Sequence, residues 1–135
     1  MNEQFSISIQ SCGRSTIEIT PQIATLVETM DQGLCHVFLH HTSASLMITE
    51  NADHDVQTDL ENFLSTLVRD GDPAYHHDQE GDDDMAAHIR SVLTQTELTI
   101  PVKNGRLLLG TWQGIYLWEH RYQPHQRRIT VTLLS

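Results

Sequence analysis

The chain contains nine histidines in 135 residues, and four of them stand at positions suited to chemistry. His88 flanks the apolar stripe of a predicted helix, His41 ends a predicted strand, and His76 and His77 lie in a polar loop. Imidazole is the commonest metal-ligating side chain and also titrates near neutral pH. Three imidazoles from a strand end, a loop and a helix would form an open tetrahedral metal site with water as the fourth ligand. Their spacing matches no short zinc signature, so buried histidines that hydrogen-bond backbone carbonyls are the competing interpretation.

A second group of chemically capable residues lies in the segment 110–122, GTWQGIYLWEHRY. Alternation along a strand predicted over 115–122 places Glu119 and Arg121 on one face, after Ile115 and Leu117. Arg121 could grip a phosphate or carboxylate with its planar fork, with Glu119 beside it. The alternative is a solvated ion pair worth only ~0 to 1 kcal/mol. The strand is bulky on both faces, which predicts cover on both sides by a sheet, a helix or another subunit.

Two polar segments precede predicted helices and have both a structural and a functional interpretation. Asn51 and Asp53 come just before a helix predicted over 52–67, where either could cap the helix or face an anion. The triplet Asp82–Asp84 opens a helix that runs to Leu93 and suits the positive end of its dipole. Binding of Mg²⁺ by this triplet is the alternative.

These groups are positioned by a mixture of strand and helix patterns in a single domain spanning residues 1–135. Strands are predicted over 4–11, 16–19, 34–41, 44–50, 96–103, 106–109, 115–122 and 127–134, and helices over 20–31, 52–67 and 82–93. Asn104-Gly105 predicts a tight hairpin turn. About seven strands and two or three helices indicate an α+β domain with a largely antiparallel sheet or sandwich.

Composition excludes several classes of function. The chain has 8 Lys and Arg against 18 Asp and Glu, a net charge of −10 that is the wrong sign for nucleic-acid binding. Residues 91–135 are the basic exception, which leaves a small phosphorylated ligand as a candidate partner. No stretch approaches the ~20 apolar residues that span a bilayer, so we expect a cytoplasmic protein without membrane contact. Cys12 and Cys35 are predicted to be reduced thiols packed as small hydrophobes.

Three stretches, HHTSASLMITENADHDVQTDLENFL, YHHDQEGDDDMAAHI and NGRLLLGTWQGIYLWEHR, give the chain its resemblance to a known family. From about residue 4 to 134 the sequence resembles the YjbQ or UPF0047 family, also called the secondary thiamine-phosphate synthase family. The resemblance implies a seven-stranded, two-sheet β-sandwich with helices, assembled as a homotrimer. It also implies a histidine-rich pocket, metal-bound in some members, formed here by His41, His77 and His88. Ala86 and Thr94-Gln95 depart from the family pattern without touching a proposed ligand.

The activity that the resemblance implies is the joining of a pyrimidine diphosphate to a thiazole phosphate with loss of pyrophosphate. Such chemistry usually uses Mg²⁺ and cationic side chains, whereas three imidazoles suit Zn²⁺ better, so the synthase activity is interpreted as a side activity. We expect a trimeric enzyme for a phosphorylated heterocycle, with Zn²⁺, or alternatively Mg²⁺, at the histidines. Arg121 would hold the anion, and Glu119 would act as an acid/base or as a partner of the metal ligands. The pocket would be lined by Asn51, Asp53 and Gln113. The catalytic candidates are Asp53, Glu119 and Arg121. A non-catalytic metal or ligand binder and a metal-assisted hydrolase are the alternatives.

Overall fold

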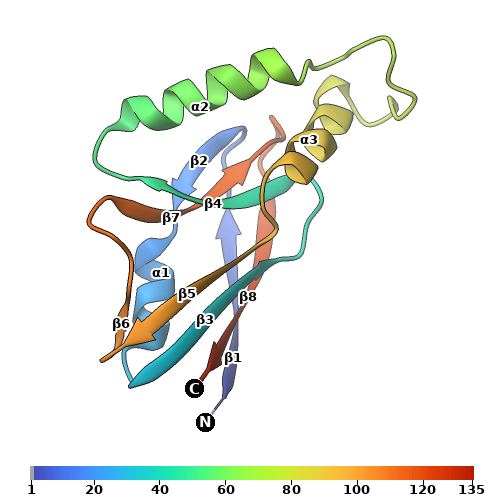
Figure 1. Cartoon of the computed structure of the whole chain (residues 1–135). Helices are drawn as coiled ribbons and strands as arrows, with labels where there is room; N and C mark the ends of the chain where they lie inside the picture. Colours follow the sequence, from blue (N-terminus) through green and yellow to red (C-terminus); the bar gives the residue numbers. More distant parts are fainter. Residues whose placement is uncertain (1) are drawn as a thin grey trace.

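The computed structural model describes residues 2–135 as two antiparallel β-sheets and three helical segments (Figure 1). The strands are β1 (Glu3–Gln10), β2 (Ser15–Glu18), β3 (Gln32–Leu39), β4 (Ala44–Glu50), β5 (Glu97–Lys103), β6 (Arg106–Leu107), β7 (Gln113–Glu119) and β8 (Gln126–Leu134). The helices are α1 (Thr20–Ala24), continued by a 3₁₀ turn η1 (Thr25–Val27), α2 (His54–Leu67) and α3 (Asp82–Leu93). One sheet has the order β1-β8-β3-β5-β6, and the other has the order β2-β7-β4. The α+β class and the two-sheet architecture predicted from the sequence are therefore present, with eight strands in place of seven.

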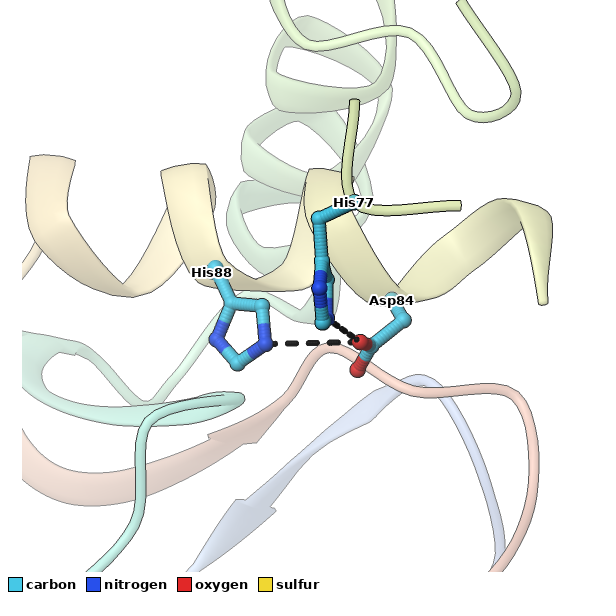
Figure 2. Close-up of side chains that lie close together, drawn as sticks. All are labelled: His77, Asp84 and His88. Carbon is cyan, nitrogen blue, oxygen red and sulfur yellow. Dashed lines mark hydrogen bonds and ion pairs between the residues drawn. The ribbon is translucent and has the colours of Figure 1, made fainter. Parts of the chain in front are cut away.

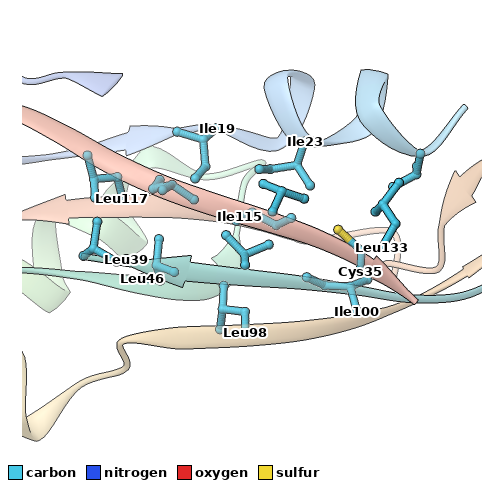
Figure 3. Close-up of a cluster of buried hydrophobic side chains, with 14 of the residues drawn as sticks. Ile19, Ile23, Cys35, Leu39, Leu46, Leu98, Ile100, Ile115, Leu117 and Leu133 are labelled. Atoms are coloured by element: carbon cyan, nitrogen blue, oxygen red, sulfur yellow. The ribbon is translucent and has the colours of Figure 1, made fainter. Parts of the chain in front are cut away.

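The two sheets share one apolar core. Its side chains come from the inward faces of the strands and from α1, including Ile19, Ile23, Leu46, Ile100 and Leu117, all of which are 2% exposed or less (Figure 3). Strict alternation along β5 and β8 gives each of these strands one buried face. This packing makes the sandwich a rigid base for the loops at its ends.

The strand β7 is buried on both faces, as its bulky sequence predicts. Ile115 and Leu117 point into the core between the sheets, while Trp118 packs on the other face with Leu64 of α2 and Ala86 of α3. A second sheet on one side and two helices on the other thus cover β7 within a single chain. Its bulk is explained without another subunit.

Several predicted boundaries are wrong by a few residues. The helix predicted over 20–31 ends at Ala24 and tightens to a 3₁₀ turn, since β-branched residues such as Thr25 and Val27 favour helix weakly. The strand predicted over 34–41 ends at Leu39, which leaves His41 in the connection to β4. The strand predicted over 115–122 ends at Glu119, which leaves Arg121 in the following loop.

The predicted turn is confirmed, and the prediction for the two cysteines is confirmed for one of them. Asn104 and Gly105 have φ values of 53° and 72°, as the predicted hairpin turn requires. Cys35 is buried, as predicted, whereas Cys12 is exposed, so only one of the two free thiols is packed as a hydrophobe. Among residues 2–135, none of the helices has the length and apolar character needed to cross a bilayer.

Candidate metal site

His77, Asp84 and His88 meet at the start of α3 (Figure 2). Asp84 and His88 are four residues apart on α3 and therefore share one face of that helix, while His77 approaches from the loop before it. His77 Nε2 lies 2.6 Å from Asp84 Oδ2, and His88 Nε2 lies 3.4 Å from the same oxygen. One nitrogen or oxygen from each residue lies within 4.8 Å of the others. Ligands around a tetrahedral Zn²⁺ with bonds of 2.0–2.1 Å are separated by about 3.3 Å. The distance from His88 to Asp84 already matches this separation, whereas His77 and Asp84 would have to move slightly apart to bind the ion.

The hydrogen bond of His88 to the main chain fixes which ring nitrogen faces Asp84. His88 Nδ1 lies 3.0 Å from the carbonyl oxygen of Thr42, which can only accept, so Nδ1 carries a proton. In the neutral ring, Nε2 then carries a lone pair, which faces a carboxylate oxygen of Asp84. Two acceptors at 3.4 Å repel each other unless a proton or a metal ion lies between them. This carbonyl contact is the outer support commonly found for metal-binding histidines.

Asp84 is the buried member of the cluster. Its side chain is 4% exposed, and Arg121 Nη1 donates to its Oδ1 at 2.7 Å. Burial alone would raise the pKa of Asp84, but the hydrogen bond with His77 and the charges of Arg121, His88 and His77 outweigh burial and lower that pKa. The carboxylate is thus held ionised, as a metal ligand must be.

The cluster is open to solvent on the side of His77. The side chain of His77 is 48% exposed and borders an open hollow of about 510 Å³ formed by residues 76–80. Glu80 Oε2 lies 3.2 Å from His77 Nε2, and its side chain is 64% exposed. A site with three protein ligands and an accessible fourth position is the arrangement of catalytic zinc centres.

His41, the third histidine of the predicted set, is engaged elsewhere in the single chain. Its Nε2 accepts a hydrogen bond of 2.8 Å from the backbone N–H of Arg128, and its Nδ1 lies 3.3 Å from Arg127 Nη1. Burial and the charge of Arg127 lower the pKa of His41. Its neighbour Thr42, however, supplies the carbonyl that orients His88. The metal-ligand role of His41 stays a prediction.

Glu119 is fully buried and forms an ion pair with Arg127, whose Nε donates to Glu119 Oε1 at 2.8 Å. Ser11 and the backbone N–H of Arg121 donate to the same carboxylate. Burial would raise the pKa of Glu119, but these hydrogen bonds prevail and lower it. Glu119 therefore faces the inside of the protein, where it supports the loop that carries Arg121.

The remaining predicted pocket residues lie at the other end of β7. In the pairing of β4 with β7, Gln113 lies opposite Glu50, whereas Glu119 lies opposite Ala44. Gln113 and Glu119 are therefore six residues apart along β7, which is roughly 20 Å. Asp53 caps α2 by accepting from the backbone N–H of Asp55 at 2.9 Å. Gln113 Oε1 accepts from Gly110 N, and Asn51 N donates to the Trp112 carbonyl. Within one chain these residues do not reach the histidines, and their pocket role stays a prediction.

Two antiparallel sheets with this histidine–aspartate cluster at one end define a small α+β sandwich protein. The chain belongs to the UPF0047 family, because residues 4–135 match the family described as UPF0047 protein YjbQ-like. It is 53% identical to UPF0047 protein sll1880 of Synechocystis over 130 residues, which is 95% of this chain and 88% of that protein. It is 48% identical to UPF0047 protein YjbQ of Salmonella typhimurium, over 87% of this chain and 84% of the relative.

Solved structures show the same fold. An uncharacterised YjbQ/UPF0047 protein from Clostridium acetobutylicum superposes with a TM-score of 0.88 and 33% identity, covering 96% of this chain and 99% of that one. A conserved hypothetical protein from Thermus thermophilus, TT1486, gives a TM-score of 0.88 at 31% identity, with the same coverage. The family predicted from the three sequence stretches is thus confirmed.

Proposed function

We propose that this chain is a small metal-binding enzyme that acts on a phosphorylated heterocyclic substrate, with a secondary thiamine-phosphate synthase-like activity. The observation that carries the metal-binding part is the convergence of His77 Nε2 and His88 Nε2 on one carboxylate oxygen of Asp84, with the other ring nitrogen of His88 held by the Thr42 carbonyl. Two imidazoles and one carboxylate suit Zn²⁺, whereas Mg²⁺, the alternative ion, prefers oxygen ligands and its own waters. The substrate class and the synthase activity rest on the family resemblance.

Each residue of the site has a separate task in this proposal. A bound divalent ion supplies Lewis acidity and a water of lowered pKa. His77, Asp84 and His88 would hold the ion, and Thr42 keeps the proton of His88 on Nδ1. Glu80, exposed beside His77, can accept a proton at its carboxylate on the open side of the site.

Metal-assisted hydrolysis is the second candidate function, and the pairing of Arg121 favours it. Arg121 contacts the carboxylates of Asp83 and Asp84, so its charge is already compensated and it does not present a free cation to a diphosphate. Hydrolysis needs only a polarised bond and an activated water, which an open three-ligand site provides. A non-catalytic metal or ligand binder is the third alternative.

One incubation series separates these functions. The Zn²⁺-loaded and Mg²⁺-supplemented protein is mixed with the pyrimidine diphosphate, with and without the thiazole phosphate, and products are followed by mass spectrometry. Thiamine phosphate and pyrophosphate formed in equal amounts would support the synthase. Phosphate or pyrophosphate released without the thiazole would support hydrolysis, and stoichiometric metal binding without turnover would support the binder. A product that forms equally well with Asp84→Asn would refute the proposed site.

We also propose that the protein is a cytoplasmic homotrimer, as the resemblance implies. Assembly would offer one route by which Asn51, Asp53 and Gln113 approach the histidines of a neighbouring subunit. Light scattering of the purified protein is expected to give three times the 15.4 kDa chain mass. A single-chain mass at micromolar concentration would refute the trimer.

A further inference from the structure

We propose that Arg121 is a positioning residue that sets the geometry of the metal ligands, in place of an anion-binding residue. The inference rests on the proposed metal site. Arg121 acts on the site through its contact with Asp84 and through the loop that carries His77.

The three donor groups of Arg121 hold three separate points around the site. Nη1 donates to Asp84 Oδ1 at 2.7 Å, Nε donates to Asp83 Oδ2 at 3.0 Å, and Nη2 donates to the carbonyl oxygen of Glu80 at 2.9 Å. The side chain is only 16% exposed. The planar guanidinium presents these donors in a fixed fork, which the single ammonium of lysine cannot reproduce.

The contact with Asp84 decides which carboxylate oxygen faces the histidines. Because Arg121 occupies Oδ1, the carboxylate cannot rotate freely, and Oδ2 stays directed at His77 and His88. Without Arg121 the carboxylate would lose the hydrogen bond at Oδ1 that fixes this orientation. The ligand would then have to be ordered by the incoming ion, and the cost of ordering reduces affinity.

The contact with Glu80 ties the loop to the helix. His77 lies in the loop before α3, whereas Asp84 and His88 belong to α3. Arg121 holds the main chain of Glu80 and the first turn of α3 at once, and thereby fixes the position of His77 relative to the other two ligands.

Arg121 itself is anchored to the rigid end of β7. Its backbone N–H donates to Glu119 Oε2 at 3.1 Å, and the next backbone N–H, of Tyr122, donates to Asp83 Oδ2 at 2.8 Å. Glu119 is fully buried in its ion pair with Arg127. The buried pair therefore supports Arg121, and Arg121 supports the ligands, which is how outer residues commonly fix a metal site.

The test compares the substitutions Arg121→Gln and Arg121→Lys with Arg106→Gln, an exposed arginine on β6, as the matched control. Zn²⁺ affinity is measured by competition with a chromophoric chelator, and ligand geometry is measured from the visible absorption of the Co²⁺-loaded protein. We expect both Arg121 variants to lose about 10–100-fold in Zn²⁺ affinity, the usual cost of removing an outer partner, and to change the Co²⁺ spectrum. Arg106→Gln is expected to match the wild type in both.

Near-UV circular dichroism shows whether each variant is folded, and Asp83→Asn provides a second variant if Arg121→Gln is not. Asp83→Asn removes an anchor of Arg121 but leaves His77, Asp84 and His88 intact, and it is expected to weaken Zn²⁺ binding and alter the Co²⁺ spectrum in the same direction. Folded variants that bind Zn²⁺ within twofold of wild type, with an unchanged Co²⁺ spectrum, would overturn the role of Arg121. So would a variant that keeps its metal affinity but loses binding of inorganic phosphate. Wild-type protein that binds neither Zn²⁺ nor Co²⁺ would instead overturn the proposed metal site together with this inference.

Discussion

We predict that the buried histidine His120 makes the folded protein less stable in mild acid. Its side chain is fully buried, its Nδ1 accepts from Arg90 Nε at 3.2 Å, and its Nε2 lies 2.9 Å from Ser45 Oγ. Because Arg90 is always a donor, the proton of His120 resides on Nε2 and is given to Ser45. Burial, together with the charges of Arg90, Arg14 and Arg127, lowers the pKa of His120 from 6.5 to about 2.

The sign of the effect follows from the lowered pKa. Below pH 6.5 the unfolded chain binds a proton at this residue that the folded chain does not, so stability is present above that pH and is lost as the pH falls. Each pH unit below 6.5 lowers the free energy of unfolding by about 1.36 kcal/mol. Because pH 5 lies 1.5 pH units below 6.5, the loss at pH 5 is about 2 kcal/mol. The acidic groups of the core, such as Glu119, titrate below this range because their pKa values are lowered.

The assay is urea unfolding of the metal-free protein at pH 7 and pH 5, at one protein concentration, for wild type and His120→Gln. Glutamine keeps one acceptor and one donor but does not titrate. We expect the loss of unfolding free energy between the two pH values to be about 2 kcal/mol smaller in the variant than in wild type. An equal pH dependence in both proteins would refute the argument that His120 stays neutral in the folded state.

Further predictions concern stability and metal linkage. Glu61→Gln leaves the fully buried Arg90 without its countercharge and is expected to cost about 3 kcal/mol in urea unfolding, whereas an unchanged midpoint would contradict the importance of the pair. Gly105→Ala places a Cβ 2.5 Å from the Glu28 carbonyl at a φ of 72°, and we expect a loss of more than about 1 kcal/mol; no loss would mean that the turn rearranges freely. Zn²⁺ at about 100 times its dissociation constant should stabilise the wild type by about 2.7 kcal/mol in thermal unfolding, and a similar gain in Asp84→Asn would contradict the assigned ligands.

Most of the fold can be predicted from the sequence, because local patterns determine it. The alternation in β5 and β8 and the Asn104-Gly105 turn each depend on neighbouring residues alone. The ends of the elements are less predictable. Arg121 is an example. The strand β7 stops at Glu119, and beyond it the backbone N–H of Tyr122 donates to Asp83, a residue of a distant segment.

The candidate site could be predicted only in part. His77 and His88 were expected to come together, and the structure places their ring centroids 5.4 Å apart. The sequence predicts Asp84 at the acidic start of a helix, where its charge suits the helix dipole, with Mg²⁺ binding by the triplet Asp82–Asp84 as the alternative. Its position four residues before His88 was the available signal, since that spacing puts both on one helix face. The pairing of Arg121 with Asp84, 37 residues away, leaves no trace in local pattern.

The most direct test of the account is calorimetric titration of Zn²⁺ into the metal-free protein. The variants are Asp84→Asn, His88→Ala and His41→Gln, with His76→Ala as the control because His76 is the exposed neighbour of His77. We predict one Zn²⁺ per chain in wild type and His76→Ala, and a loss of affinity of at least about 100-fold in Asp84→Asn and His88→Ala, beyond the range for an outer partner. His41→Gln reports whether His41 contributes to the site. Wild-type protein that binds no Zn²⁺, or folded Asp84→Asn and His88→Ala that bind it as tightly as wild type, would contradict the central claim.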